Sequence, residues 1–129
     1  MNNFSFGKNS EDRMSGVNYQ LIEVARLALS MSPIDFGIPR HGGLRTAEEQ
    51  QKLFNDKASQ LDGTIKKSYH QSGLALDVFA YVDGKASWDE CHLTIVAAAM
   101  LEAANRLSVN MRWGGHWSNF KDMPHFEVR

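Results

Sequence analysis

The sequence predicts an α+β fold in which helices pack on a small, largely antiparallel sheet. Apolar residues recur at helical spacing over residues 17–31 and, most clearly, over 87–107. Short runs rich in β-branched, aromatic and aliphatic residues occupy 74–81, 109–113 and 124–128, and each run is typical of a strand. We find no internal repeat and no linker, so these elements are expected to form one domain.

The amino-terminal part of the chain predicts one helix and one short strand. Residues 1–16 are polar and contain glycine and serine, and we expect an irregular lead-in there. The helix over 17–31 is closed by Pro33. Its apolar face consists of Leu21, Val24, Ala25, Ala28 and Leu29. Residues 34–44 then predict a short strand that ends at Arg45.

Capping and turn signals place the next elements. Thr46 and Glu49 form a capping box, which opens a helix to about Asp56. Residues 57–69 are expected to be a polar loop, and the Asp83-Gly84 pair after the 74–81 strand is a strong turn signal.

A second capping box, Ser87 with Glu90, predicts the start of the longest helix. One continuous apolar stripe should bury it against the sheet. The stripe consists of Leu93, Val96, Ala97, Met100, Leu101, Ala104 and Leu107.

Composition narrows the classes of partner. The 129 residues predict a single domain, and 14 basic against 15 acidic side chains give a net charge of -1. Such a balance provides no general attraction to nucleic acid or to an anionic membrane. Cys91 is the only cysteine, so no intramolecular disulfide is possible. The polar segment Met1–Ser10 is unlike a secretory signal, and the apolar run Ile95–Leu101 falls far short of the ~20 residues that span a bilayer.

The first segment with candidate functional residues surrounds Asp77. Asp77 lies in the otherwise apolar run over 74–81, where burying an unpaired carboxylate is costly. It therefore requires a cation or several hydrogen-bond donors. Gly73 gives the chain freedom to turn just before the strand, which can bring His70 back over the end where Asp77 projects.

The second segment surrounds His125. Over 124–128 the alternation of a strand puts His125 and Glu127 on one face. Pro124 suits the first position of a strand, where its missing donor costs little. Asp122 lies three residues before His125, across the Met123-Pro124 turn, which suits a general base that activates water. Glu127 is the next candidate for that role. Two histidines and one carboxylate match the three protein ligands typical of catalytic zinc.

Two further motifs accompany these segments. Gly43-Leu44-Arg45-Thr46 precedes Glu49-Gln50, and Trp113-Gly114-Gly115-His116-Trp117 comes shortly before Asp122. With the Ser-x-His-x-x-Gly-x-Ala-x-Asp segment ending at Asp77 and the Asp-x-x-His segment ending at His125, the set resembles the zinc peptidases of bacterial cell-wall peptides. That family includes D-alanyl-D-alanine dipeptidases and carboxypeptidases, phage L-alanyl-D-glutamate endopeptidases (endolysins) and the zinc fold of Hedgehog signalling domains. The resemblance covers nearly the whole chain, with the motifs in family order.

By position, the resemblance implies that His70, Asp77 and His125 are zinc ligands and that Asp122 is the catalytic base. It implies that Arg45 holds either the substrate carbonyl, where negative charge develops, or a neighbouring carboxylate.

Ser68 and His116 are less clearly placed by the resemblance. Ser68 is a candidate for substrate binding, although ordering the loop through a backbone hydrogen bond is the simpler role. His116 stands where relatives often have Asp or Asn. The base is Asp rather than the Glu of the dipeptidase branch, which favours the phage endopeptidase branch.

The function we expect is zinc-dependent hydrolysis of peptidoglycan stem peptides, at the L-alanyl-D-glutamate bond. The alternatives are a D-alanyl-D-alanine carboxypeptidase or dipeptidase and a zinc-stabilised binding module without turnover. We expect a monomer that is made in the cytoplasm without a signal peptide. It would act on the wall after release during host lysis, or from a phage particle.

Overall fold

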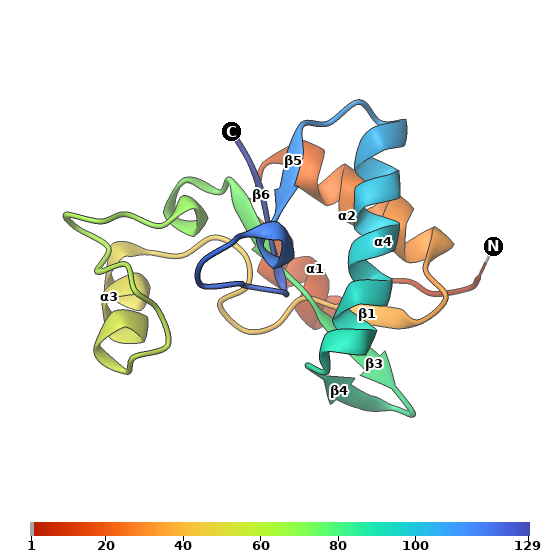
Figure 1. Cartoon of the computed structure of the whole chain (residues 1–129), viewed down its shortest axis with the longest axis horizontal. Helices are drawn as coiled ribbons and strands as arrows, with labels where there is room; N and C mark the ends of the chain where they lie inside the picture. The colour runs from red at the N-terminus through yellow and green to blue at the C-terminus, as the bar shows by residue number, and fades with distance from the viewer. Residues whose placement is uncertain (1) are drawn as a thin grey trace.

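The computed structural model describes residues 2–129, and two helices form the centre of its core. Helix α2 (Tyr19–Met31) packs against α4 (Glu90–Arg106), as Figure 1 shows. Asn18 caps α2 by accepting a hydrogen bond from the backbone N–H of Gln20. The face predicted for α2 is confirmed, since all five of its apolar residues are buried: Leu21, Val24, Ala25, Ala28 and Leu29.

Helix α4 starts later than the capping box predicts. Asp89 is its N-cap and accepts from the backbone N–H of Cys91. Ser87 instead closes a strand, and its hydroxyl accepts from the backbone N–H of Asp89. The prediction was wrong because two oxygen-bearing residues compete for the cap position. The apolar stripe is buried at Leu93, Val96, Ala97, Met100 and Ala104, whereas Leu107 is 39% exposed beyond the helix end.

The strands form two three-stranded sheets rather than the single sheet expected. One has the order β1 (Asp35–Gly37), β3 (Phe79–Val82), β4 (Lys85–Ser87), and the other has the order β2 (Ala75–Asp77), β6 (His125–Val128), β5 (Met111–Trp113). Every pairing is antiparallel. The helices and antiparallel sheets thus confirm the α+β class.

The run over 74–81, predicted as one strand, is divided between the two sheets. The backbone N–H of Asp77 donates to Gly42, and that of Val78 donates to Pro124, so the chain leaves one sheet and enters the other. The apolar residues on both sides of Asp77 concealed this break. The turn predicted at Asp83 and Gly84 is confirmed, since both residues have positive φ (54° and 76°), as a two-residue hairpin turn requires.

The amino-terminal lead-in is not irregular throughout, because α1 (Lys8–Met14) lies within it. Met14 is 1% exposed, and the Ser10 hydroxyl accepts from the backbone N–H of Ile38. These two inward-facing residues, four apart on one helix face, fasten α1 to the body. The polar composition of the segment concealed them.

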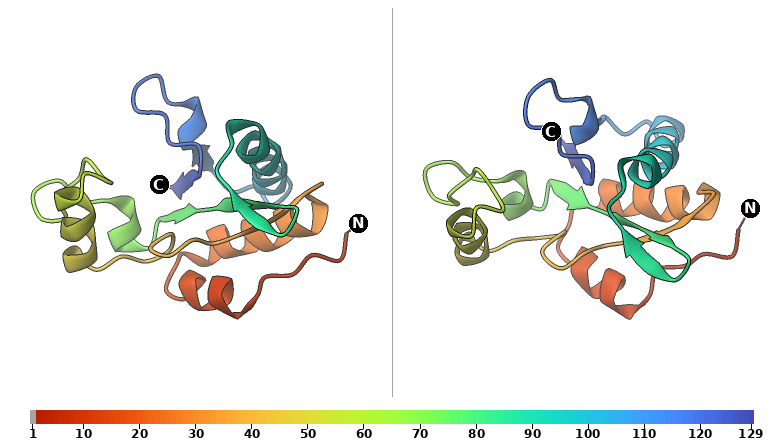
Figure 2. Two further views of the ribbon diagram at one scale, coloured as in Figure 1. Left: turned by 90° about the horizontal axis from the view of Figure 1, so that it is seen from below. Right: turned by 60° about the horizontal axis from the view of Figure 1, so that its bottom comes forward.

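Helix α3 (Ala47–Asn55) stands to one side of the α2–α4 core, as both views in Figure 2 show. Its predicted capping box is confirmed by reciprocal contacts between Thr46 and Glu49. The strand expected to end at Arg45 is shorter, because β1 ends at Gly37 and an irregular segment leads to α3.

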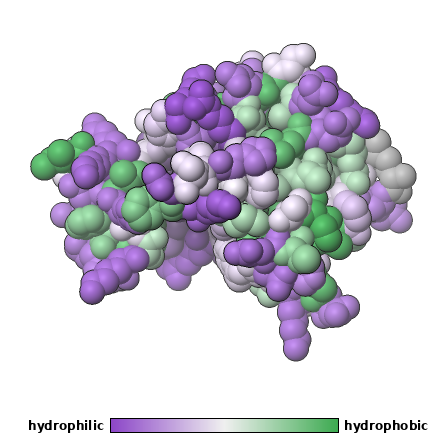
Figure 3. Space-filling model, in the orientation of Figure 1, coloured by the Kyte–Doolittle hydropathy of each residue, from purple (hydrophilic) through white to green (hydrophobic). Residues whose placement is uncertain are grey.

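Two single-turn helices complete the fold, η1 (Tyr69–Ser72) and η2 (Gly114–His116). Hydrophilic side chains cover most of the face drawn in Figure 3, with hydrophobic ones in small groups between them. Within residues 2–129, no helix combines the length and apolar character needed to cross a membrane.

Candidate active site

Strand pairing brings together the two segments that carry the candidate ligands, one around Asp77 and one around His125. In the register of β2 with β6, Asp77 lies opposite His125. His70 arrives from η1, which ends at Gly73 in the left-handed conformation (φ 71°). A residue with a Cβ at position 73 would be strained there, and its Cβ would lie 2.6 Å from the Gly16 carbonyl oxygen. The turn predicted at Gly73 is therefore the feature that brings His70 over the end of β2.

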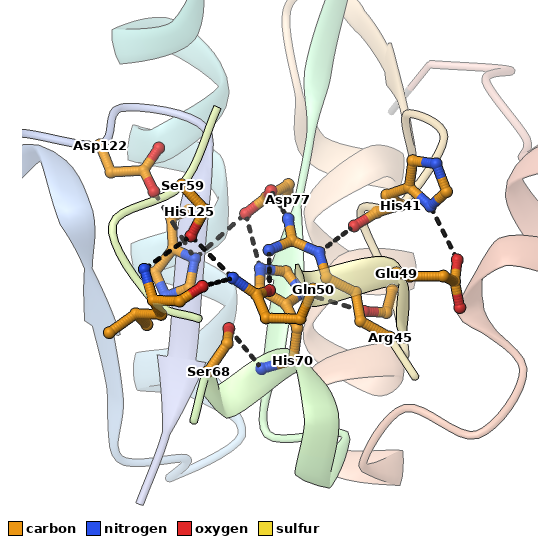
Figure 4. Close-up of polar contacts among 12 residues, drawn as sticks. His41, Arg45, Glu49, Gln50, Ser59, Ser68, His70, Asp77, Asp122 and His125 are labelled. Atoms are coloured by element: carbon orange, nitrogen blue, oxygen red, sulfur yellow. Dashed lines mark hydrogen bonds and ion pairs between the residues drawn. The ribbon is translucent and has the colours of Figure 1, made fainter. Parts of the chain in front are cut away.

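The three predicted ligands form a tight cluster (Figure 4). Asp77 Oδ1 lies 3.2 Å from His70 Nε2 and 3.1 Å from His125 Nδ1. One ligand atom from each residue lies within 4.8 Å of the others. Both histidines are buried. The cluster could therefore hold a metal ion, and its two nitrogens and one oxygen suit zinc.

The outer nitrogen of each histidine is bound to the protein. His70 Nδ1 lies 2.9 Å from the Gly43 carbonyl oxygen, and His125 Nε2 lies 2.9 Å from Glu127 Oε1. Each acceptor favours a proton on the nitrogen that it contacts. The nitrogen facing Asp77 then has a lone pair for a metal. Glu127, the reserve candidate for the base, is engaged in this contact.

The cluster is strongly coupled electrostatically. Burial acts to raise the pKa of Asp77, but the charges and hydrogen bonds of His70 and His125 outweigh it and lower that pKa well below the ordinary value. Burial acts to lower the pKa of His125, yet hydrogen bonds to Asp77 and Glu127 raise it to about 9. In the metal-free protein, a proton on His125 thus partly substitutes for a metal cation.

Asp122 lies beside the cluster without joining it. Its Oδ2 is 3.9 Å from His125 Nδ1, and its side chain is 46% exposed. Burial and the neighbouring Asp77 charge raise the pKa of Asp122, so this carboxyl group takes up a proton more readily than an ordinary aspartate.

The Trp-Gly-Gly-His-Trp segment positions Asp122. The backbone N–H of Asp122 donates to Gly114 at 3.1 Å, and the Trp113 indole donates to the Met123 carbonyl at 2.6 Å. A Cβ on Gly114 would lie 2.3 Å from the Asp122 carbonyl oxygen, so only glycine permits this approach. His116, in contrast, is exposed and packs on Trp113, outside the cluster.

Arg45 is committed to protein groups at all three nitrogens. Nη2 donates to Asp77 Oδ2 at 3.2 Å, Nε to the His41 carbonyl at 2.7 Å and Nη1 to Gln50 Oε1 at 3.0 Å. The side chain is 12% exposed, and this burial lowers its pKa. All three contacts are with the protein itself, so a contact of Arg45 with substrate stays a prediction.

Gln50 is a residue that sequence reasoning missed. It is fully buried, and its Nε2 donates to Ser59 Oγ and to the Leu61 carbonyl, both at 2.7 Å. It thus joins Arg45 to the loop after α3. A glutamine on a polar helix carries no pattern that separates it from a solvated one, so only its place next to Arg45 could have signalled this role.

Ser68 has the structural role that we considered simpler. It caps η1, and its hydroxyl accepts from the backbone N–H of His70 at 3.2 Å. The Gln71 side chain accepts from the Ser68 N–H in return, which completes a capping box. Ser68 is 5% exposed.

A cleft of about 720 Å³ opens over the cluster. Its lining includes residues 58–61 and 67–69, Trp117 and residues 120–122. Arg45, Asp77 and His125 also line the cleft. A cluster of two imidazoles and a carboxylate, beside a further carboxylate in an open cleft, is the arrangement of a metal-dependent hydrolase.

Comparison with known proteins identifies a peptidase family. The family model described as phage L-alanyl-D-glutamate peptidase matches residues 2–128, and the chain belongs to that family. It is 36% identical over 128 residues to the L-alanyl-D-glutamate peptidase of Escherichia phage T5, covering 98% of this chain and 90% of the relative. It is 28% identical over 102 residues to the peptidoglycan L-alanyl-D-glutamate endopeptidase CwlK of Bacillus subtilis, covering 67% of this chain and 57% of the relative.

A solved structure also matches. The L-Ala D-Glu endopeptidase ChiX of Serratia marcescens superposes with a TM-score of 0.84 at 32% identity, covering 97% of this chain and 90% of that one. The family resemblance expected from the motifs is confirmed.

Proposed function

We propose that this protein is a zinc-dependent endopeptidase that hydrolyses the L-alanyl-D-glutamate bond of peptidoglycan stem peptides. The observation that carries the proposal is the His70, Asp77 and His125 cluster, with Asp122 beside it, on the floor of an open cleft. Membership of the phage L-alanyl-D-glutamate peptidase family supports the choice of bond.

We assign the zinc to His70 Nε2, His125 Nδ1 and a carboxylate oxygen of Asp77. Support comes from the donor set and from the hydrogen bonds that fix the outer nitrogens of both histidines. When bound, zinc supplies a Lewis acid that polarises the scissile carbonyl and makes water easier to deprotonate.

Asp122 accepts the proton of the attacking water and returns it to the leaving amine. Its half-exposed carboxylate can meet both water and substrate, whereas Glu127 is 5% exposed and bound to His125. Arg45 orients Asp77 through the Nη2 contact. Ser68 acts through the η1 turn that presents His70, rather than by touching substrate.

We expect the chain to be a single catalytic domain that works as a monomer on the cell wall. It would reach the wall after release from the producing cell or as part of a phage particle. Names of relatives from phages of Escherichia and Listeria support this placement.

Mass spectrometry of the products from purified peptidoglycan tests the proposal. The expected products are stem peptides with D-glutamate at the new amino terminus, while L-alanine stays on the glycan. Release of D-alanine alone would instead establish a carboxypeptidase. The Asp122→Asn variant is the matched control, because it should fold and leave the peptidoglycan intact.

A further inference from the structure

Four basic side chains line the cleft, and they differ in how they are held. All three nitrogens of Arg45 donate hydrogen bonds to protein groups, on Asp77, His41 and Gln50. Lys67 and Lys121 are exposed, and within residues 2–129 neither is fixed by an ion pair or a hydrogen bond. A flexible, unheld lysine loses considerable side-chain entropy when it binds a ligand. Arg129 is the remaining cation.

Arg129 is held in place through Nε, while its two terminal nitrogens remain able to donate hydrogen bonds. Its Nε donates to Glu127 Oε2 at 3.1 Å, and its guanidinium carbon lies 5.5 Å from the centre of the Tyr69 ring. The side chain is 48% exposed along the cleft wall. In the described part of the chain, no protein group accepts from its two terminal nitrogens. These nitrogens form a preorganised fork of the kind that binds a carboxylate through two parallel hydrogen bonds.

The proposed reaction brings such a carboxylate close to the reacting bond. In a stem peptide, D-glutamate continues the chain through its side-chain carboxyl, so its α-carboxylate sits on the carbon attached to the scissile nitrogen. This negative charge must enter a cleft that already holds Asp122, Asp77 and Glu127. A cation with free hydrogen-bond donors would offset part of this repulsion, and Arg129 lies beside one of these carboxylates, Glu127.

We propose that the terminal nitrogens of Arg129 bind the α-carboxylate of the substrate's D-glutamate, an inference that rests on the proposed function. Glu127 then has two roles, since one oxygen orients His125 and the other orients Arg129. The metal ligand and the substrate anchor are thereby fixed to the same carboxylate. The enzyme should favour stem peptides with a free α-carboxylate over those in which that group is an amide.

Two peptides that differ only in this group, acid or amide, test the inference. The wild-type enzyme should cleave the acid with a kcat/KM roughly 10- to 100-fold above that for the amide, as a charge-assisted pair predicts. Arg129→Gln should reduce this ratio to near one, chiefly by raising KM for the acid. Arg129→Lys should keep part of the preference, because it retains the charge but not the fork.

The ratio of kcat/KM for the acid to that for the amide distinguishes a substrate contact of Arg129 from a general disturbance of the site. If Arg129→Gln merely loosened Glu127 and His125, both peptides would slow by the same factor, and the preserved ratio would overturn the inference. Lys121→Gln is the matched control and should keep the wild-type ratio. Loss of the preference in Lys121→Gln instead of Arg129→Gln would also overturn it. Equal cleavage of both peptides by the wild type contradicts the Arg129 role alone, whereas cleavage of neither contradicts the proposed function as well.

Discussion

At the scale of single residues, each member of the cluster has one polar atom facing the others and a second atom tied to a fixed group. His70 is tied to the Gly43 carbonyl, His125 to Glu127 and Asp77 to Arg45. Such outer contacts orient metal ligands and tune their affinity. These contacts distinguish the three residues that should bind zinc from Asp122, which should accept a proton from water.

Replacing Asp122 by Asn should keep zinc and fold while lowering kcat by about 10²-fold or more, because only the proton acceptor is lost. Zinc content and turnover on a stem peptide should be measured together. His70→Ala is the comparison, since it should lose the metal. A zinc-free Asp122→Asn protein would make Asp122 a ligand instead of a base.

Replacing Arg45 by Met should weaken zinc binding by roughly 10- to 100-fold, as is typical when an outer partner of a metal ligand is removed. The reason is that Asp77 Oδ2 loses the guanidinium that orients it. Arg45→Lys should recover part of the affinity. Competition with a chromophoric chelator measures the zinc affinity of each variant. If zinc affinity stays at the wild-type level while kcat falls, Arg45 acts on the substrate oxyanion instead.

The raised pKa of His125 predicts how the metal-free protein responds to pH. Its folded-state pKa of about 9 lies above the ordinary 6.5, so protonated His125 stabilises the metal-free fold. That contribution is fully present below pH 6.5 and is lost as pH rises through 9. Melting temperatures of the chelated protein should therefore fall over this window, and those of His125→Ala should not show the same fall.

At the scale of elements, close backbone approaches fix where the ligand-bearing segments lie. Gly73 ends η1, Gly114 admits the backbone of Asp122, and Gly43 lies against α1. Two of these approaches, at Gly73 and Gly43, join segments distant in sequence, and none of the three depends on a large side chain. The Asp77–His125 register between β2 and β6 then completes the cluster.

Gly43→Ala should be strongly destabilising, because the new Cβ would lie 1.8 Å from the Arg13 carbonyl oxygen and backbone must move. We expect a loss of about 2 kcal/mol or more in the free energy of unfolding, together with weaker zinc binding, because Gly43 accepts from His70. Gly7→Ala is the matched control, since nothing lies within 4 Å of its Cβ. Equal denaturant midpoints for the two variants would contradict the packing argument.

At the scale of the whole molecule, the cluster brings together side chains from segments that are far apart in the sequence. η1, β2 and β6 each contribute one ligand candidate, and the loop before α3 supplies Arg45. The apolar core between α2 and α4 contains no member of the cluster, although Leu76 and Phe126, each next to a ligand candidate in sequence, pack in it. The fold should therefore persist without metal, but with lower stability.

Removing zinc with a chelator should lower the melting temperature reversibly, and one equivalent of zinc should restore it, since metal binds the folded state alone. His116→Ala is the control histidine, because it lies outside the cluster and should keep both zinc and the shift. A chelator that leaves the melting temperature of the zinc-loaded protein unchanged would argue against the site.

The fold class, helices α2 and α3 and the residues of the cluster could be predicted from the sequence, because they depend on local periodicity, capping and motif spacing. The entry of residues 74–81 into two sheets and the helix α1 within the lead-in could not be predicted, since both depend on a few contacts distant in sequence. The same holds for the partners of Arg45, Glu127 and Arg129. Their roles arise from which oxygen each nitrogen meets, and residue order along the chain does not specify that geometry.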